Sequence, residues 1–205
     1  MAGNGTLTDK GFTIKPKKLK GATLAEVDVD RKKNGMVDPN DKSQKFYGAT
    51  DVTIELKIGT EVWYPGGMHI LNFKVVLMPQ LLAPEVIVSS VINVCVPDKL
   101  GGMSAKAKKE WARFYKALVK HEKEHVADGK KLAEEMLKEM AGLSVTLKSE
   151  SVNEAHIKKE SLKLLAAEAT KKFGGGEIKK RVNERMKKLD SVNGHGAVHL
   201  DRTIP

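Results

Sequence analysis

The 205-residue chain has little of several features that mark specialised classes of protein. It contains one cysteine, Cys95, so no disulfide can form within the chain and the fold does not depend on an oxidising compartment. Aromatic residues make up 5% of the sequence, too few for a platform on which the bases of a single strand would stack. Hydrophobic and charged residues make up 40% and 30%, which is enough apolar material for a core and excludes a disordered tail.

Long hydrophobic runs are also lacking. The most apolar stretch, Gln80–Val96, is interrupted by a proline and several polar residues, so it is too short and too polar to span a bilayer. The first residues include lysines but not the apolar segment of a signal peptide. We therefore expect no integral membrane association, and a location that is cytoplasmic or reached by export without a signal peptide.

Charge of one sign is in excess. The 36 Lys and Arg residues outnumber the 26 Asp and Glu residues, for a net charge of +10. This balance permits contact with nucleic acid or an anionic membrane. In the C-terminal half, however, lysines are mixed with glutamates at helical spacing, as in residues 130–139. That mixture is typical of a solvated helix surface with intrahelical ion pairs and argues against nucleic acid as a partner.

The first hundred residues alternate in hydrophobicity with the period of two that is typical of half-buried strands. We expect strands at Phe12–Leu19, Thr23–Val29, Asp51–Ile58, His69–Leu77 and Glu85–Val96. The turn residues Tyr64–Gly67 between the third and fourth of these runs predict an antiparallel hairpin. Residues Asp30–Gln44 are expected to form a polar loop.

From Ser104 onward, apolar residues recur every three or four positions, the period of a helix. A cap at Ser104 predicts a helix that extends to about Ala141. The capping-box spacing of Ser151 and Glu154 predicts a second helix, to about residue 173. A third is expected over residues 177–189. We therefore predict one α+β domain over residues 1–205, with a β-rich half (1–100), a helical half (101–189) and a tail (190–205) that lies over the site.

Residues 121–125 read His-Glu-Lys-Glu-His, an HExxH motif. Residues four apart lie on one face of a helix, so His121 and His125 present two imidazoles, a preferred ligand of zinc, to one point. Glu122 projects beside that point, where it can take a proton from a zinc-bound water. Both histidines continue an inward-facing apolar stripe, where they would be costly without a metal or hydrogen-bond partners. That stripe consists of Trp111, Phe114, Leu118, Leu132 and Met136.

Several residues are candidates for the third zinc ligand. They are Asp128 on the same helix, Glu154, His156 and Glu160 on the next helix, and His195 in the tail. We prefer His195, because tetrahedral zinc needs its third ligand from a different direction. The glycines that flank this residue allow a close, tightly turned backbone. Asp190 is then expected to bond the free ring nitrogen of a ligand histidine.

A family resemblance rests on the HExxH helix. The run Glu110–Phe114, followed by Leu118 and residues 121–125, resembles a bacterial family of predicted zinc-dependent proteases catalogued as domain of unknown function 922. The resemblance covers residues 12–199 and includes the Leu77-Met78-Pro79 step after a strand. It also includes an ending with Asp190 and His195-Gly196, with Asn193 in place of the family's threonine. It implies a zincin-like fold and zinc-dependent protease activity.

These observations predict a zincin-like metallopeptidase that hydrolyses a protein or peptide substrate through a zinc-bound water activated by Glu122. His199 or Tyr115 would assist the oxyanion, and the edge strand His69–Leu77 would receive the substrate in extended form. Two alternatives stay open: a zinc-stabilised binding module without turnover, and a basic nucleic-acid-associated protein. The expected zinc ligands are His121, His125 and His195, and the expected catalytic residues are Glu122 and His199.

Overall fold

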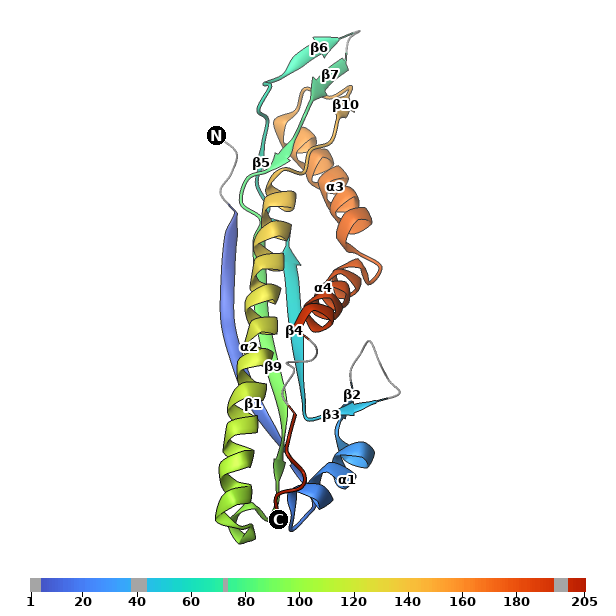
Figure 1. Cartoon of the computed structure of the whole chain (residues 1–205). Coiled ribbons are helices and arrows are strands. Elements are labelled where there is room, and N and C mark those ends of the chain that lie inside the picture. The colour runs from blue at the N-terminus through green and yellow to red at the C-terminus, as the bar shows by residue number, and fades with distance from the viewer. Residues whose placement is uncertain (1–4, 38–43, 72–73, 194–198) are drawn as a thin grey trace. The chain divides into compact units, whose positions relative to one another are not determined.

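The computed structural model describes residues 5–37, 44–71, 74–193 and 199–205 (Figure 1). It confirms the α+β class, with an N-terminal sheet followed by helices. In chain order the elements are β1 (Thr6–Leu19), α1 (Leu24–Asn34), β2 (Met36–Val37), β3 (Lys45–Phe46), β4 (Gly48–Lys57), β5 (Val62–Trp63), β6 (His69–Leu71), β7 (Lys74–Leu77), β8 (Gln80–Leu81), β9 (Glu85–Pro97), η1 (Leu100–Gly102), α2 (Ala105–Ala141), β10 (Leu147–Ser149), α3 (Glu154–Phe173) and α4 (Glu177–Asn193).

The chain forms two compact units, each of which contains residues from the β-rich and the helical parts of the sequence. Unit 1 comprises Met1–Lys10, Ile54–Val88 and Lys130–Arg181. Unit 2 comprises Gly11–Thr53, Ser89–Gly129 and Val182–Pro205. The HExxH motif lies in unit 2, and the expected substrate strand, His69–Leu77, lies in unit 1.

A three-stranded sheet has the order β1-β9-β4, so the apolar β9 is central and β4 is an edge strand. In unit 2 the Cys95 backbone N–H donates to the Tyr47 carbonyl, and the Asn93 side chain donates to Asp51. These two contacts run in opposite senses along the chain, so β4 is antiparallel to β9. Figure 1 draws the arrowheads of β1 and β9 at the same end, so the sheet is mixed, whereas we expected an antiparallel one.

The predicted hairpin between Asp51–Ile58 and His69–Leu77 is wrong. The Tyr64–Gly67 turn does form, with the Gly67 N–H bonded to the Tyr64 carbonyl and a positive φ of 68° at Gly67. It connects β5 to β6, however, and these strands pair with β8 and β7. Local turn chemistry was visible in the sequence, but the strand partners are set by contacts between distant residues.

The segment predicted as a strand at Thr23–Val29 is instead the start of α1. Thr23 is its N-cap, and its hydroxyl accepts a bond from the Glu26 N–H while the Glu26 carboxylate accepts from the Thr23 N–H. This is a capping box, whose Thr-x-x-Glu spacing was present in the sequence. Two orphan donors of the first turn are satisfied in this way, which favours a helix over the alternation of apolar residues.

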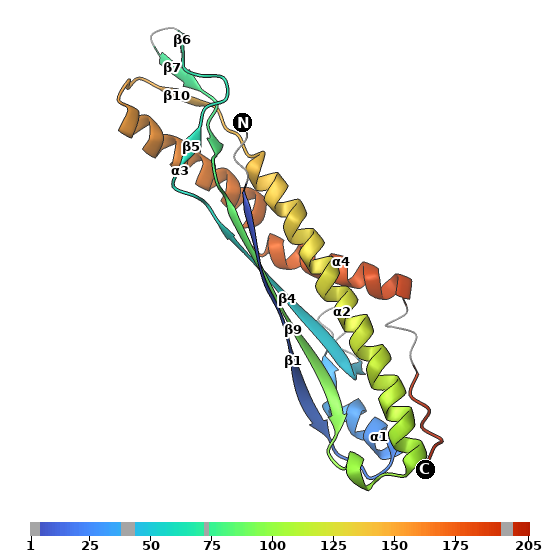
Figure 2. The same cartoon turned by 90° about the vertical axis from the view of Figure 1, so that its left-hand side faces the viewer.

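In unit 2 the N-terminal part of α2 lies along one face of the sheet (Figure 2). Ser104 caps this helix as predicted, because its hydroxyl accepts from the Ala107 N–H at 3.1 Å. Trp111 and Phe114 are buried and pack edge-on against Tyr47, with ring centroids 5.9 and 4.9 Å from it. The remaining core consists mainly of Leu19, Leu24, Val27, Ile92, Val94, Cys95, Met103, Ala107, Leu118 and Leu200.

In unit 1 the strands β6, β7 and β10 form an antiparallel sheet whose core includes Val75, Leu77 and Leu147, together with Ile157 of α3. Helix α3 begins at residue 154, after an N-cap at Asn153 whose side chain accepts from the His156 N–H. The N-cap predicted at Ser151 is therefore wrong by two positions.

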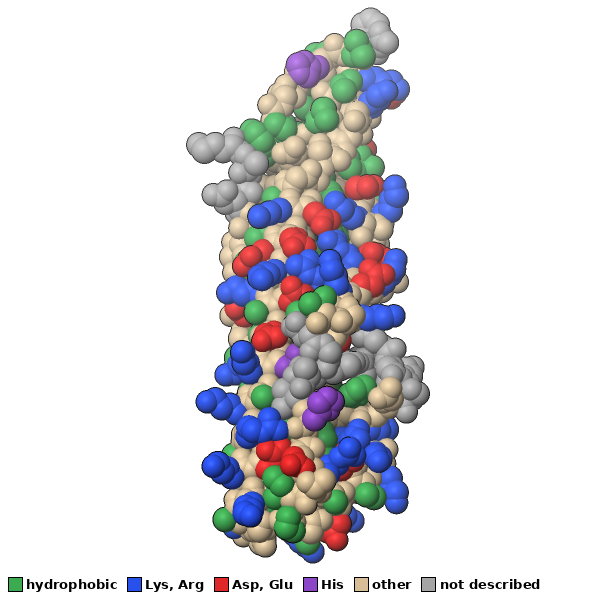
Figure 3. Space-filling view, viewed as in Figure 1, with side chains coloured by type: hydrophobic (Ala, Val, Ile, Leu, Met, Phe, Trp, Pro, Cys, Tyr) green, Lys and Arg blue, Asp and Glu red, His purple; other side chains and the backbone are tan. Residues whose placement is uncertain are grey.

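One face of the molecule shows side chains of both charges. On the face drawn in Figure 3, Lys and Arg side chains are interspersed with Asp and Glu side chains. Within the described residues, no helix combines the length and the apolar character that crossing a membrane requires.

Candidate metal centre

Helix α4 is longer than the sequence predicted, and the difference matters for the site. It continues past Leu189 to residue 193, because the sequence has no glycine or proline until Gly194. Asp190, which we expected in an irregular tail, is therefore helical. Val182, Met186 and Asp190 are four apart and share one face of this helix.

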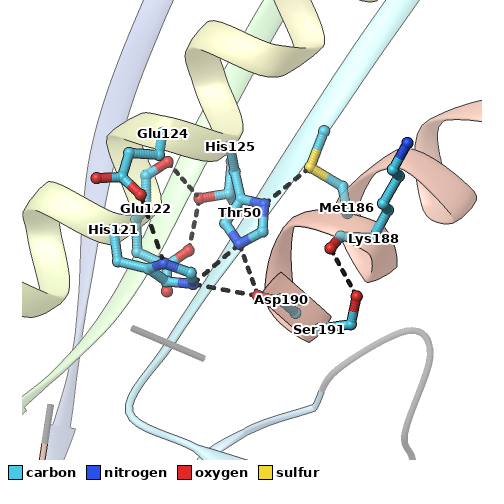
Figure 4. Close-up of polar contacts among 9 residues, drawn as sticks. All are labelled: Thr50, His121, Glu122, Glu124, His125, Met186, Lys188, Asp190 and Ser191. Carbon is cyan, nitrogen blue, oxygen red and sulfur yellow. Dashed lines mark hydrogen bonds and ion pairs between the residues drawn. The ribbon is translucent and has the colours of Figure 1, made fainter. Parts of the chain in front are cut away.

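Two helices bring the site together in unit 2 (Figure 4). Helix α2 supplies His121 and His125, which are 6% and 5% exposed. Helix α4 supplies Met186 and Asp190. Each helix thus contributes a pair of residues four positions apart, and the two pairs face each other.

Three donor atoms converge at this point. Asp190 Oδ1 lies 3.1 Å from His121 Nε2 and 3.0 Å from His125 Nε2. The two Nε2 atoms are 3.1 Å apart, and the rings meet edge to face, with centroids 4.7 Å apart. Within the described residues, these three form the group of His, Cys, Asp and Glu side chains that is compact enough to hold a metal ion.

The spacing of the donors fits a small tetrahedral ion. Zinc bonds of roughly 2.0–2.1 Å place two ligand atoms about 3.3 Å apart across a tetrahedral angle, close to the separations at this site. Hydrogen bonds alone explain these three mutual contacts poorly. A ring N–H points in one direction, so it cannot make a good hydrogen bond both to Asp190 and to the other histidine. Two imidazoles and one carboxylate are also a donor set that catalytic zinc sites use, with one position left open.

The outer ring nitrogens have different surroundings. His125 Nδ1 lies 3.1 Å from the sulfur of Met186. His121 Nδ1 is buried without a hydrogen-bond partner in the described part of the chain, and a carboxylate oxygen of Glu124 lies 4.0 Å from it. Both rings therefore direct Nε2 toward Asp190 and keep Nδ1 on the side away from it.

Glu122 lies beside the donors but faces the sheet. Its side chain is 4% exposed, and the Thr50 hydroxyl on β4 donates to its Oε2 at 2.7 Å. A Cβ added at Gly48 would lie 2.5 Å from Glu122 Oε1. The absence of a side chain at Gly48 thus makes room for the carboxylate, and Thr50 orients it.

The same face of β4 is also close to α2 about two turns after Glu122. A Cβ at Gly129 would meet Val52 at 2.7 Å. Gly48, Thr50 and Val52 alternate along the strand and so point to the same side, toward the helix. This close packing holds Glu122 against an edge strand.

Burial and nearby charges perturb two groups at the site. Burial lowers the pKa of His121, but the bond to Asp190 and the carboxylates of Glu122, Asp190 and Glu124 outweigh it, so the pKa is raised. Burial raises the pKa of Glu122, and the Thr50 bond and the two histidines only partly offset this. Both shifts come from crowding acidic and imidazole groups in a place with little water.

The other predicted site residues have different positions. His195 lies outside the described residues, so its assignment as a ligand stays a prediction. His199 is exposed, and its backbone oxygen accepts a bond from Arg113. Tyr115 packs against the core of unit 2. The alternative ligands are bonded elsewhere or belong to unit 1: Asp128 pairs with Arg185 at 3.0 Å, His156 pairs with Glu160 at 3.3 Å, and Glu154 lies in the first turn of α3.

Sequence reasoning missed Met186, Gly48 and Thr50. Asp190 was expected to bond a ligand histidine, and it does lie at hydrogen-bond distance from two of them. Its spacing of four from Met186 was the signal that could have placed both on one helix face. Gly48 and Thr50 had no local signal, because their role depends on β4 packing against α2. The lone cysteine is buried, and burial raises the pKa of Cys95 to about 11.

Comparisons with known proteins add one match. A family model described as bacterial protein of unknown function (DUF922) matches residues 14–196. No curated protein and no solved structure matches the chain.

Proposed function

We propose that this chain, which belongs to the bacterial DUF922 family, is a zinc-dependent peptidase. The observation that carries the proposal is the convergence of His121, His125 and Asp190 on one point, with an anchored Glu122 beside them. The proposed ligand set replaces the tail histidine, His195, with Asp190.

His121 and His125 would hold the ion through Nε2, and Asp190 through Oδ1. When bound, zinc would supply a Lewis acid that polarises the scissile carbonyl and lowers the pKa of a water. The negative charge of Asp190 and the burial of the rings favour a divalent cation here, since a buried carboxylate between two imidazoles is stabilised by positive charge.

Glu122 would act as the general base and then as the general acid. It would accept the proton of the attacking water and deliver it to the leaving amine. The Thr50 hydroxyl donates to Oε2, which leaves Oε1 to take the proton. Because Gly48 has no side chain, the carboxylate fits against the strand, and the Thr50 hydroxyl orients it. General acid–base catalysis requires such positioning.

Strand β4 would receive the peptide. It is one of the two edge strands of its sheet, and it contacts Glu122 through Thr50. An extended substrate can add to such an edge through backbone hydrogen bonds. This proposal replaces the strand expected from sequence, His69–Leu77, with Gly48–Thr53.

The rival reading, a zinc-stabilised binding module, is supported less well. Such a module would need the three donors but would not need a buried carboxylate next to them. Burying a carboxylate costs folding free energy. A role in catalysis explains the buried Glu122, with its Thr50 donor and the glycine opposite it, and zinc binding alone does not. The interspersed charges on the face drawn in Figure 3 do not favour nucleic acid.

The test is peptide hydrolysis by Glu122→Gln and Asp190→Ala variants. We expect Glu122→Gln to keep its zinc and its fold and to lose hydrolysis by a factor of at least about 10³, because an amide cannot accept the proton. Asp190→Ala should lose both zinc and hydrolysis. Unchanged hydrolysis in Glu122→Gln would exclude the proposed mechanism, and zinc binding without hydrolysis in the wild type would favour the binding module.

A further inference from the structure

We infer that Met186 is a positioning residue, whose sulfur accepts a hydrogen bond from His125 Nδ1 and so directs Nε2 of the same ring to the metal. This inference rests on the proposed function and deepens it. It assigns to a buried methionine the role that a carboxylate or a backbone carbonyl usually has beside a ligand histidine.

The chemistry of the contact decides the tautomer. A thioether sulfur has no proton to donate and accepts hydrogen bonds weakly. The 3.1 Å contact between His125 Nδ1 and Met186 Sδ is therefore a hydrogen bond only when Nδ1 carries the proton. In a neutral imidazole that leaves the Nε2 lone pair free, and Nε2 is the atom that faces Asp190 at 3.0 Å.

The placement of Met186 follows from the register of α4. Met186 is one helical turn before Asp190, as His121 is one turn before His125 on α2. Asp190 reaches the inner nitrogens of both rings, and Met186 reaches the outer nitrogen of one. A single helix face thus supplies both the third donor and the support for a histidine (Figure 4).

Two other roles for Met186 fit the geometry less well. The sulfur contacts Nδ1, the nitrogen opposite the one that faces Asp190, so it does not point to the proposed ion as a fourth ligand. A residue that only filled space would not need its sulfur at hydrogen-bond distance from a ring nitrogen. Met186 is 7% exposed, so water does not readily replace it as an acceptor.

The two histidines provide an internal comparison. His121 Nδ1 is buried without a hydrogen-bond partner among the described residues, whereas His125 Nδ1 has the sulfur. We therefore expect loss of the sulfur to affect His125 and to leave His121 unchanged. A general loosening of the helix pair would affect both rings.

The experiment compares three variants of the full chain. Met186→Leu keeps the apolar volume but removes the acceptor. Met186→Gln restores an acceptor oxygen at nearly the same reach. Met103→Leu is the matched control, since Met103 is a buried methionine in the core of the same unit. Zinc affinity is measured by competition with a chromophoric chelator, and the histidine ring nitrogens of the zinc-loaded proteins are observed by ¹⁵N NMR.

We expect Met186→Leu to weaken zinc binding about tenfold, the lower end of what loss of a supporting partner costs, and to speed solvent exchange of the His125 Nδ1 proton. Met186→Gln should restore affinity to within about threefold, and Met103→Leu should match the wild type. Equal affinity and equal proton exchange in Met186→Leu and the wild type would overturn the inference while the metal site stands. Absence of zinc binding in the wild type would overturn the proposed function, and the inference with it.

Discussion

Replacing Gly48 with alanine tests how the Glu122 carboxylate is held. The new Cβ would lie 2.5 Å from Glu122 Oε1 and 3.0 Å from a methyl carbon of Leu118. An ordinary van der Waals contact needs about 3.4 Å or more, so the carboxylate must move by roughly 0.9 Å. Because the atom that moves is the end of a flexible side chain, the cost in folding stability should be small, about 1 kcal/mol.

The expected effect is on catalysis. A displacement of about 1 Å in a reacting group lowers the rate by up to about 10²-fold, so we expect kcat of Gly48→Ala to fall by about 10- to 100-fold. Zinc content should not change, because the donors His121, His125 and Asp190 face α4 and not β4. The assay is hydrolysis of a fluorogenic peptide library, with zinc content and thermal unfolding measured on the same samples.

A matched control is Gly101→Ala, because a Cβ at that glycine meets no atom within 4 Å. It should behave as the wild type in every measurement. Hydrolysis by Gly48→Ala at the rate of the control would refute the argument that this space positions the base. Loss of zinc in Gly48→Ala would show instead that the substitution disturbs the whole site.

Thr50→Val, which removes the donor to Glu122 Oε2, should lower kcat about tenfold and leave zinc content unchanged, with steady-state kinetics as the check. Asp28→Asn should destabilise the chain by about 3 kcal/mol in urea unfolding, since this buried carboxylate accepts bonds from two arginines and a tyrosine; a change below about 1 kcal/mol would contradict this. Two Arg113 bonds hold the pKa of Glu110 at about 2, despite its burial, and the Asp201 N–H also bonds it. The folded pKa is below the unfolded one, so its stabilising contribution is complete above about pH 4.5 and is lost as the pH falls toward 2; protection of the Asp201 amide against exchange, relative to its intrinsic rate, should fall over that range, and in Glu110→Gln it should be lower than in the wild type at neutral pH and should not change with pH.

The sequence was most informative where the signal was local and periodic. The α2 helix, its Ser104 cap and its buried stripe were predicted, because a single helix face requires apolar residues at three- and four-residue spacing. The HExxH histidines face inward for the same reason. Their burial follows from the same stripe that buries Trp111 and Phe114.

Prediction failed where distant residues decide the outcome. The two runs expected to pair across the Tyr64–Gly67 turn do not pair with each other, because β4 instead pairs with the apolar β9. The capping box at Thr23 was present in the sequence, but the alternation of apolar residues around it led us to predict a strand. In both cases the sequence contained two local patterns that predicted different structures.

The position of Asp190 illustrates the same limit. Flanking glycines made His195 attractive as a donor from a different direction, while Asp190 was placed in an irregular tail. The helix in fact extends through Asp190, and a second helix crossing near the first meets the requirement for a different direction as well as a tail does. The end of a helix that lacks a strong stop signal is hard to place from sequence, and here the last turn includes Asp190, the proposed third ligand.

The most direct test of the metal site is the zinc content of the purified chain, measured by mass spectrometry beside His121→Ala, His125→Ala, Asp190→Asn and His195→Ala variants. We predict close to one zinc per chain in the wild type and in His195→Ala. The first two variants should lose it, and Asp190→Asn should bind it at least about tenfold more weakly. Equal metal content in the wild type, His121→Ala, His125→Ala and Asp190→Asn would contradict the proposed centre, and loss of zinc in His195→Ala alone would return the third ligand to the tail.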